Sequence, residues 1–365
     1  NYGDYRQALR YFHSPAQNWV FAGSTDIALT VAGRFPLKWE EQGRFIGDGS
    51  DPRYDWQGWI PFDHIPFVKN PERGFVSSAN QNPTDNSYPY YLDDNFAPYE
   101  RGRRINDRLS AMNDITARDM QQLQMDTYSY HAQTVLPKLL GILETSTLSS
   151  REQEALEELR GWNYENKGNL TAPSLFAWWW DALEEAIWGD EYDAVNRPMR
   201  RPDREQTAGM ILADSTARWY DNITTGQTET LDDLVNTSFQ QALRQLAAEF
   251  GTSRDRWKWG YVNNTAINHL ADIPGLGQPQ VFTGGGAESI NAVQGGHGPS
   301  WRMVVELSPQ TKGYGIYPGG QSGNPGSPYY DHMIDDWSDG KLYPLWFMKG
   351  EPSSKDSVAY SIILR

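Results

Sequence analysis

The spacing of apolar positions predicts strands near the start of the chain. Two short apolar runs flank the turn at residues 23–26, so the segment from Trp19 to Pro36 is expected to form a hairpin. Residues 47–87 are instead dense in Gly, Pro, Asp, Asn and aromatic residues, with only short extended runs such as 74–78. We expect this segment to be rigid and rich in loops, and such loops often hold functional sites.

The middle third of the chain carries apolar residues at helical spacing, and capping residues mark the helix ends. Ser149 with Glu152 makes a capping-box pattern, Thr230 with Asp233 marks another helix start, and Gly251 marks the end of that helix. We interpret the stretch as a largely helical insertion. Helices are expected at residues 116–143, 149–159, 174–188 and 230–250.

The last third of the chain returns to strand-like patterns, at residues 301–307 and 357–364. Because strands near both ends flank helices, we expect an α+β fold whose sheets need both ends of the chain. The expected organisation is one discontinuous domain. Residues 1–110 would hold part of the sheet core and the site loop, 111–255 the helical segment, and 256–365 the strands that complete the core.

Charge and composition remove several classes of protein. The formal net charge of −15 and the pI near 4.8 give a surface that repels phosphate backbones, so nucleic acid is not expected as a partner. No apolar run approaches the roughly 20 residues of a membrane helix, so we expect no membrane span. The absence of cysteine excludes disulfides, cysteine-ligated zinc and a cysteine nucleophile.

Common catalytic patterns are also missing. The six histidines lie in unrelated contexts and no Gly-x-Ser-x-Gly motif occurs, which argues against a Ser-His-Asp triad. No histidine spacing typical of zinc sites is present, and the glycines at 284–286 do not match a phosphate-binding loop. The three tryptophans at 178–180 point in three directions on a helix, so we expect most of their area to be packed in the core.

A series of short sequence motifs, which we call words, occurs in a fixed order over nearly the whole chain. The words are Ser14–Ala22, Trp56–Phe62, Asn70–Pro71, Gly74–Val76, Ala79–Pro83, Tyr88–Tyr90, Arg101–Ile105, Gln124–Asp126, Gly298–Arg302 and Gly320–Pro325. In this order they resemble the penicillin acylase (penicillin amidase) family of N-terminal-nucleophile hydrolases. The resemblance falls on the C-terminal part of that family's β-subunit.

The resemblance implies a four-layer αββα core and an amide hydrolase whose nucleophile is a serine made N-terminal by cleavage of a precursor. The α-amine of that serine would be the base, because an amine with a pKa near 8 is partly unprotonated at neutral pH. Residue 1 here is Asn1, whose carboxamide cannot attack a carbonyl. The expected partners are therefore an upstream β-subunit segment, the α-subunit of the same precursor and a small acylated amide substrate, in a periplasmic or secreted protein.

Two residues match positions to which the family gives catalytic roles. Asn80 falls on the asparagine whose amide donates to the oxyanion of the tetrahedral intermediate, with Asn82 as the alternative if the match slips by two. Arg101 falls on the arginine that steadies this asparagine, with Arg104 as the alternative. Without the resemblance, we would interpret Asn80 as a turn-forming residue before a proline and Arg101 as a surface arginine.

Two further expectations follow from the resemblance. Some family members hold a structural calcium ion, and the adjacent carboxylates Asp93 and Asp94 lie near the position of one ligand, although calcium requires six to eight oxygens. No cofactor is expected for catalysis. A second hypothesis, from another class, is a non-catalytic binding protein with an acylase-like scaffold and an aromatic-rich surface.

Overall fold

The computed structural model describes residues 1–144, 146–193, 195 and 199–347. Over these residues a long run of helices lies between two groups of antiparallel strands, which confirms the predicted α+β class. The chain divides into two compact units. The first consists of residues 1–113 and 125–298, and the second of residues 114–124 and the described residues from 299 onward. The interpretation of the chain as one discontinuous domain stays a prediction.

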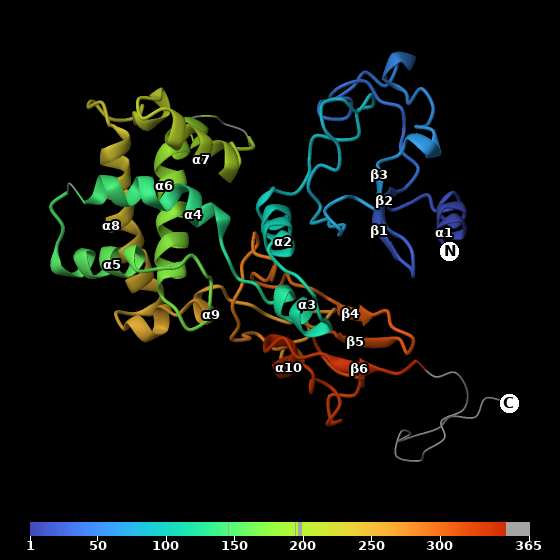
Figure 1. Ribbon diagram of the computed structural model, residues 1–365. Helices are drawn as coiled ribbons and strands as arrows, with labels where there is room; N and C mark the ends of the chain where they lie inside the picture. Colours follow the sequence, from blue (N-terminus) through green and yellow to red (C-terminus); the bar gives the residue numbers. More distant parts are fainter. Residues whose placement is uncertain (145, 194, 196–198, 348–365) are drawn as a thin grey trace. The chain divides into compact units, whose positions relative to one another are not determined.

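The elements of each unit are labelled in Figure 1. In the first unit the strands are β1 (Gln17–Ala22), β2 (Ile27–Ala32) and β3 (Phe67–Lys69), and the helices of five residues or more are α1 (Tyr2–Leu9), α2 (Glu100–Ser110), α4 (Tyr130–Leu143), α5 (Ser150–Arg160), α6 (Ala172–Asp193), α7 (Arg204–Ala213) and α8 (Leu231–Phe250). The short helix α9 (Trp259–Val262) follows. The second unit contains α3 (Ala117–Gln124), β4 (Arg302–Glu306), β5 (Lys312–Ile316), α10 (Ile334–Ser338) and β6 (Tyr343–Leu345).

Two predicted helices begin where their capping residues stand. The Ser149 side chain accepts from the backbone N–H of Glu152, whose carboxylate accepts in return from the Ser149 N–H, and α5 follows. Thr230 and Asp233 form the same reciprocal pair at the start of α8. That helix ends at Gly251, whose φ of 80° lies in the left-handed region that glycine enters without strain. Both predictions are confirmed.

The helix expected over residues 116–143 is wrong as a single element, because the chain leaves the helical path between α3 and α4. Asp126 accepts from the backbone N–H of Tyr128 at 3.1 Å, and its backbone carbonyl accepts from the N–H of Asn291 at 2.9 Å. The Thr127 carbonyl accepts from the N–H of Asn166 at 2.9 Å. Asn291 and Asn166 are distant in sequence from this segment, so no local pattern predicts their contacts with it. The strand expected at 357–364 lies outside the described residues.

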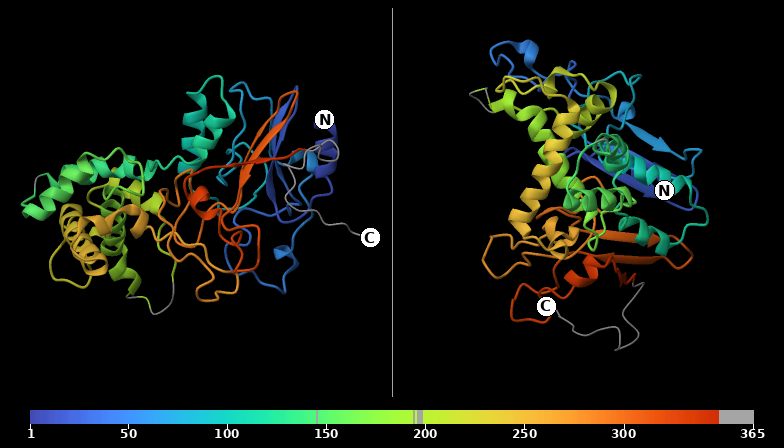
Figure 2. Two further views of the ribbon diagram at one scale, coloured as in Figure 1. Left: turned by 90° about the horizontal axis from the view of Figure 1, so that it is seen from below. Right: turned by 90° about the vertical axis from the view of Figure 1, so that its left-hand side faces the viewer.

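The largest core of the first unit forms between α4, α5, α6 and α8, which Figures 1 and 2 show as one group of helices. Buried residues of α8 recur at helical spacing, which explains why this helix packs along one face. The Trp179 ring is fully buried against Phe239 at 4.8 Å, and its Nε1 donates to the carbonyl of Val235 at 3.2 Å. Trp180 is also buried, so the packing role expected for the tryptophan triplet is confirmed for these two rings.

A leucine-to-alanine change in this core should destabilise the protein clearly. Leu139 of α4 is 0% exposed, so Leu139→Ala removes buried methyl groups and leaves a cavity, at an expected cost of about 3 kcal/mol in the free energy of unfolding. Urea denaturation monitored by circular dichroism measures the loss. The control is Leu212→Ala in α7, where the side chain is 43% exposed and the expected change is below about 1 kcal/mol. Equal losses in the two variants would contradict this location of the core.

Each unit has one three-stranded antiparallel sheet among the described residues. In the first unit the order is β1-β2-β3, which confirms the predicted hairpin, and Trp19 of β1 lies opposite Thr30 of β2. Among the described strands β1 pairs only with β2, and it is exposed along most of its length, including Trp19 and Val20. In the second unit the order is β4-β5-β6, and β4 confirms the strand predicted at residues 301–307. In the described part of the chain, the helices are too short or too polar to cross a bilayer.

Candidate active site

Asn80 lies in the loop between β3 and α2, in a backbone conformation that few residues adopt. Its φ is 67°, in the left-handed region where asparagine is tolerated better than most side chains. Its carbonyl accepts from the backbone N–H of Ala97 at 3.0 Å, and its N–H donates to Ser78 Oγ at 3.4 Å. These contacts fix the backbone, while the side chain of Asn80 is exposed.

Arg101, in the first turn of α2, holds the Asn80 side chain. Its Nη2 donates to Asn80 Oδ1 at 3.1 Å and to the carbonyl of Ala79 at 2.9 Å. A guanidinium has donors and no acceptor, so the carboxamide must turn its oxygen to Arg101 and its NH₂ group away. No hydrogen-bond partner of this NH₂ group is found among the described residues. The pair therefore presents an oriented and unoccupied donor.

The rest of α2 fixes the loop that carries Asn80. Gly102 lies against Gln81 so closely that an added Cβ would stand 3.0 Å from the Gln81 Cδ atom. Asn106 Oδ1 accepts from Arg73 Nη1 and from Ser77 Oγ, both at 2.9 Å. These supporting residues were not among the sequence candidates. Their only signal in the sequence was that Gln81 and Gly102 each belong to one of the family-like words.

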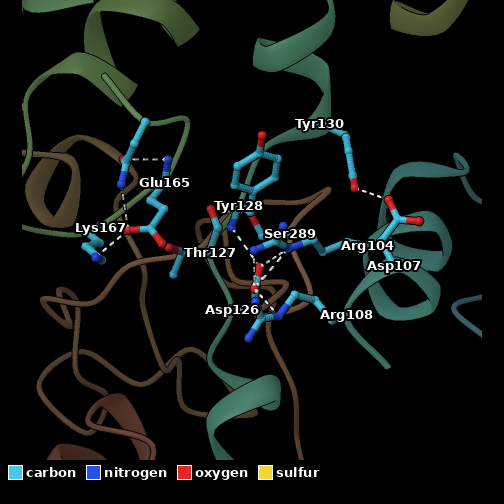
Figure 3. Close-up of polar contacts among 11 residues, drawn as sticks. Arg104, Asp107, Arg108, Asp126, Thr127, Tyr128, Tyr130, Glu165, Lys167 and Ser289 are labelled. Carbon is cyan, nitrogen blue, oxygen red and sulfur yellow. Dashed lines mark hydrogen bonds and ion pairs between the residues drawn. The ribbon is translucent and has the colours of Figure 1, made fainter. Parts of the chain in front are cut away.

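The structure separates Arg101 from its alternative, Arg104. The Nε and Nη2 of Arg104 donate to Asp126 at 3.0 and 2.7 Å, and its guanidinium lies 4.1 Å from the centre of the Tyr128 ring. Figure 3 shows the Asp126 carboxylate facing Arg104 and Arg108. The Arg104–Asp126 pair is largely buried, with side chains 16% and 12% exposed. Arg104 thus stabilises the junction before α4, whereas Arg101 contacts Asn80.

The alternative asparagine, Asn82, is engaged in its own turn. Its Oδ1 accepts from the backbone N–H of Thr84 at 3.1 Å and from Thr84 Oγ1 at 3.0 Å. This pattern is an Asx-turn, in which the side-chain oxygen substitutes for a backbone acceptor. It contributes nothing to the orientation of Asn80.

Asp93 and Asp94 do not form a calcium site with other side chains that the structure describes. Asp94 Oδ2 pairs with Arg44 Nε at 3.2 Å, and Asp93 Oδ1 accepts from the backbone N–H groups of Asp94 at 2.8 Å and Asn95 at 3.3 Å. Within the described ranges, no group of three or more His, Asp or Glu side chains is placed to hold a metal ion. The residues present do not fit the six to eight oxygen ligands of calcium, and calcium stays a prediction.

An open cleft of about 670 Å³ borders the Asn80 loop. Ser78 and Gln81, on either side of Asn80 in the sequence, line it, together with apolar side chains of β2 and β3 such as Leu29 and Phe67. About half of the lining residues are polar, so the cleft suits a ligand with both hydrocarbon and polar parts. The loop that carries Asn80 therefore borders space that an acyl chain could enter, while Asn80 itself is not one of the lining residues.

Glu100, directly before Arg101, is buried without a hydrogen bond to its Oε2 atom. Burial, with a smaller contribution from the nearby carboxylates Glu288 and Glu205, raises the pKa of this carboxyl to about 7, although its own backbone N–H and Arg204 act to lower the pKa. The first turn of α2 therefore buries a group that changes its charge near neutral pH.

Replacing Glu100 with glutamine should make stability less dependent on pH. The folded-state pKa of Glu100 lies above the unfolded value of 4.5, so its stabilising contribution is complete below about pH 4.5 and is lost as pH rises through about 7. Glutamine at this position cannot ionise. The free energy of unfolding of Glu100→Gln, relative to the wild type, should therefore rise by about 1–2 kcal/mol as the pH increases from 5 to 8. Urea unfolding at several pH values measures the difference. A difference that does not change with pH would contradict the assignment.

Comparison with solved structures defines the class of fold. The chain superposes on a thermostable penicillin G acylase from Alcaligenes faecalis with a TM-score of 0.66, covering 100% of this chain and 70% of that one at 14% identity. The fold is that of the N-terminal-nucleophile acylases, as the sequence words implied. The penicillin amidase family model matches residues 1–352, and the chain belongs to the penicillin amidase family.

Relatives in this family carry acylase names. An acyl-homoserine lactone acylase, QuiP, of Pseudomonas syringae pv. tomato is 27% identical, over 90% of this chain and 44% of its own length. The QuiP protein of Pseudomonas aeruginosa is 25% identical over 96% of this chain and 46% of its own length. Penicillin acylase 2 proenzyme of a Pseudomonas species is 23% identical over 89% of this chain and 43% of its own length. The chain thus spans less than half the length of these curated relatives.

Proposed function

We propose that this chain is part of an acylase that hydrolyses the amide bond between an acyl group and an amine, and that Asn80 donates to the oxyanion of the reaction. The observation that carries the proposal is the contact of Arg101 with Asn80 Oδ1, which leaves the NH₂ group directed away and without a partner among the described residues. Such a donor is fixed before the reaction, so it stabilises developing negative charge without reorganising. Membership of the penicillin amidase family supports the same chemistry.

In the proposed reaction, the nucleophile is a serine hydroxyl supplied by polypeptide outside this chain. The hydroxyl oxygen attacks the amide carbonyl while its proton passes to the α-amine of the same serine. The carbonyl oxygen becomes an oxyanion and accepts a hydrogen bond from Asn80 Nδ2. The amine then leaves with the proton, and water hydrolyses the acyl-serine to release the acid.

The whole protein is proposed to resemble its longer relatives in organisation. Its partners would be an upstream β-subunit segment and an α-subunit from the same precursor, and its location would be periplasmic or secreted. The substrate is proposed to be a small acylated amide. The open cleft beside the Asn80 loop, with Leu29 and Phe67 in its wall, supports an acyl group with hydrocarbon character.

Release of amine from a panel of amides tests this function. The protein, prepared with its complete precursor and processed, would be incubated with penicillin G, N-acyl-homoserine lactones of different chain lengths and an acyl anilide. Fluorescamine detects primary amines, and absorbance detects the aniline. We expect turnover of at least one substrate. Saturable binding of these amides with no release of amine would instead identify a non-catalytic binding protein.

A further inference from the structure

A small cavity lies in the first unit, with walls that share no residue with the cleft beside Asn80. Its volume is about 80 Å³, whereas a single water needs roughly 10–15 Å³ on a comparable measure. Its walls are formed mainly by the start of α4, the first half of α6, the start of α7 and the segment around residues 286–289. The space is large enough for a ligand of a few heavy atoms.

A buried histidine on the wall of this cavity lacks a partner. His131 is 3% exposed, and its Nε2 has no hydrogen-bond partner in the described part of the chain. Its ring stands edge-on to Trp180, with ring centres 4.3 Å apart, and 5.6 Å from the ring of Phe176. Buried polar atoms are almost always hydrogen-bonded. The adjoining cavity is the place from which a partner outside the chain can reach it.

The charges on the cavity wall do not balance. Arg204 is the one Lys or Arg among the wall residues, and it faces two carboxylates, Glu288 Oε1 at 3.3 Å and Asp181 Oδ1 at 3.7 Å. Burial lowers the pKa of His131 to about 3, so its imidazole is neutral and adds no positive charge. Two carboxylates therefore face one guanidinium on this wall, and of the two the Glu288 side chain is the more buried, at 18% exposed against 69% for Asp181.

The aromatic residues of the wall favour one kind of cation. Trp180, Phe176 and Trp259 line the wall, and organic cations bind well over the π-electron faces of such rings. A metal ion instead needs several oxygen or nitrogen ligands, and no group of three such side chains is suitably placed among the described residues. Aromatic rings, two carboxylates and one free imidazole nitrogen together match the needs of an alkylammonium group.

We propose that this cavity binds a small organic ammonium ion. Glu288 and Asp181 balance its charge, His131 accepts one of its N–H hydrogen bonds, and Trp180 packs against its alkyl part. The site is separate from the acylase chemistry proposed above, so the test of ammonium binding does not depend on whether the protein is an acylase.

Calorimetric titration of the purified protein with ethylammonium chloride tests the proposal. Sodium chloride at equal concentration controls for ionic strength, and ethanol is the neutral analogue of similar size. We expect saturable binding of ethylammonium, and no saturable binding of sodium ion or ethanol. Glu288→Gln and His131→Phe should each weaken binding at least about tenfold, because they remove the balancing charge and the acceptor while keeping side-chain size.

Asp255→Asn is the matched control, because Asp255 is also a carboxylate beside aromatic rings, in an open cleft with Trp178 and Tyr261. It should leave binding unchanged. No saturable binding, equal binding of ethanol, or weakening by Asp255→Asn instead of Glu288→Gln would each overturn the proposal. If the cavity variants do not fold by circular dichroism, a crystal structure of the wild type grown with ethylammonium decides. Density for the ion beside His131 upholds the site, and water there overturns it.

Discussion

Asn80→Ala should lower kcat for amide hydrolysis about a hundredfold or more in the intact, processed protein. The loss of one oxyanion donor typically raises the barrier by about 3–4 kcal/mol, and the NH₂ group of Asn80 is the donor that Arg101 directs away from itself. KM should change much less than kcat, because the donor acts mainly on the charge of the transition state. Steady-state kinetics on the best substrate of the amide panel measures both constants.

Two further variants separate the loss of the amide from other effects. Alanine at a φ of 67° strains the backbone, whereas glycine does not, so Asn80→Gly should lose as much activity as Asn80→Ala without the strain. Asn82→Ala removes the neighbouring asparagine that closes its own turn, and it should keep kcat within about threefold. If glycine restored activity, or if Asn82→Ala were the more harmful change, Asn80 would not be the oxyanion donor.

Arg101→Lys should reduce kcat by about tenfold to a hundredfold although the charge is kept. One guanidinium nitrogen donates to both Asn80 Oδ1 and the Ala79 carbonyl, and a lysine ammonium lacks the planar fork that holds these two acceptors together. The carboxamide would then rotate, and its NH₂ group would be misdirected for part of the time. Arg103→Lys, in the same helix but 53% exposed, is the control and should keep kcat within about twofold.

A variant that combines Asn80→Ala with Arg101→Lys distinguishes a role of Arg101 in positioning Asn80 from a role in supporting the fold. If Arg101 acts through Asn80, adding Arg101→Lys to Asn80→Ala should cost little more than Asn80→Ala alone, since the oriented group is already gone. Fully additive losses, or an equal loss of folding stability in the single arginine variant, would show that Arg101 supports the fold instead of the donor.

Local sequence signals predicted the elements whose determinants are local. The start of α5 depends on Ser149 and Glu152, which are three residues apart, and the turn of the β1–β2 hairpin is equally compact. α2 was not predicted, because its sequence is strongly charged and its role is to anchor a loop through Arg101 and Asn106. Its helical state depends on those tertiary contacts, which no window of sequence contains.

The same difference between local and long-range determinants applies to the candidate site. Asn80 and Arg101 were found through ordered family-like words, and the distance between their side chains then came from the structure. The cavity gave no sequence signal, because His131, Arg204 and Glu288 are far apart along the chain and meet only after folding. Burial, which leaves His131 neutral, is likewise a property of the packed molecule.

The open edge of β1 bears on how the chain behaves in solution. Among the described strands β1 pairs only with β2, so its other side offers backbone donors and acceptors to a further strand, although Tyr5 Oη already donates to the Trp19 carbonyl at 2.8 Å. The side chains of Trp19 and Val20 are exposed there. Such an edge is a template for strands of other molecules, so the protein should self-associate as its concentration rises. Recombinant material should therefore be more monodisperse at low protein concentration.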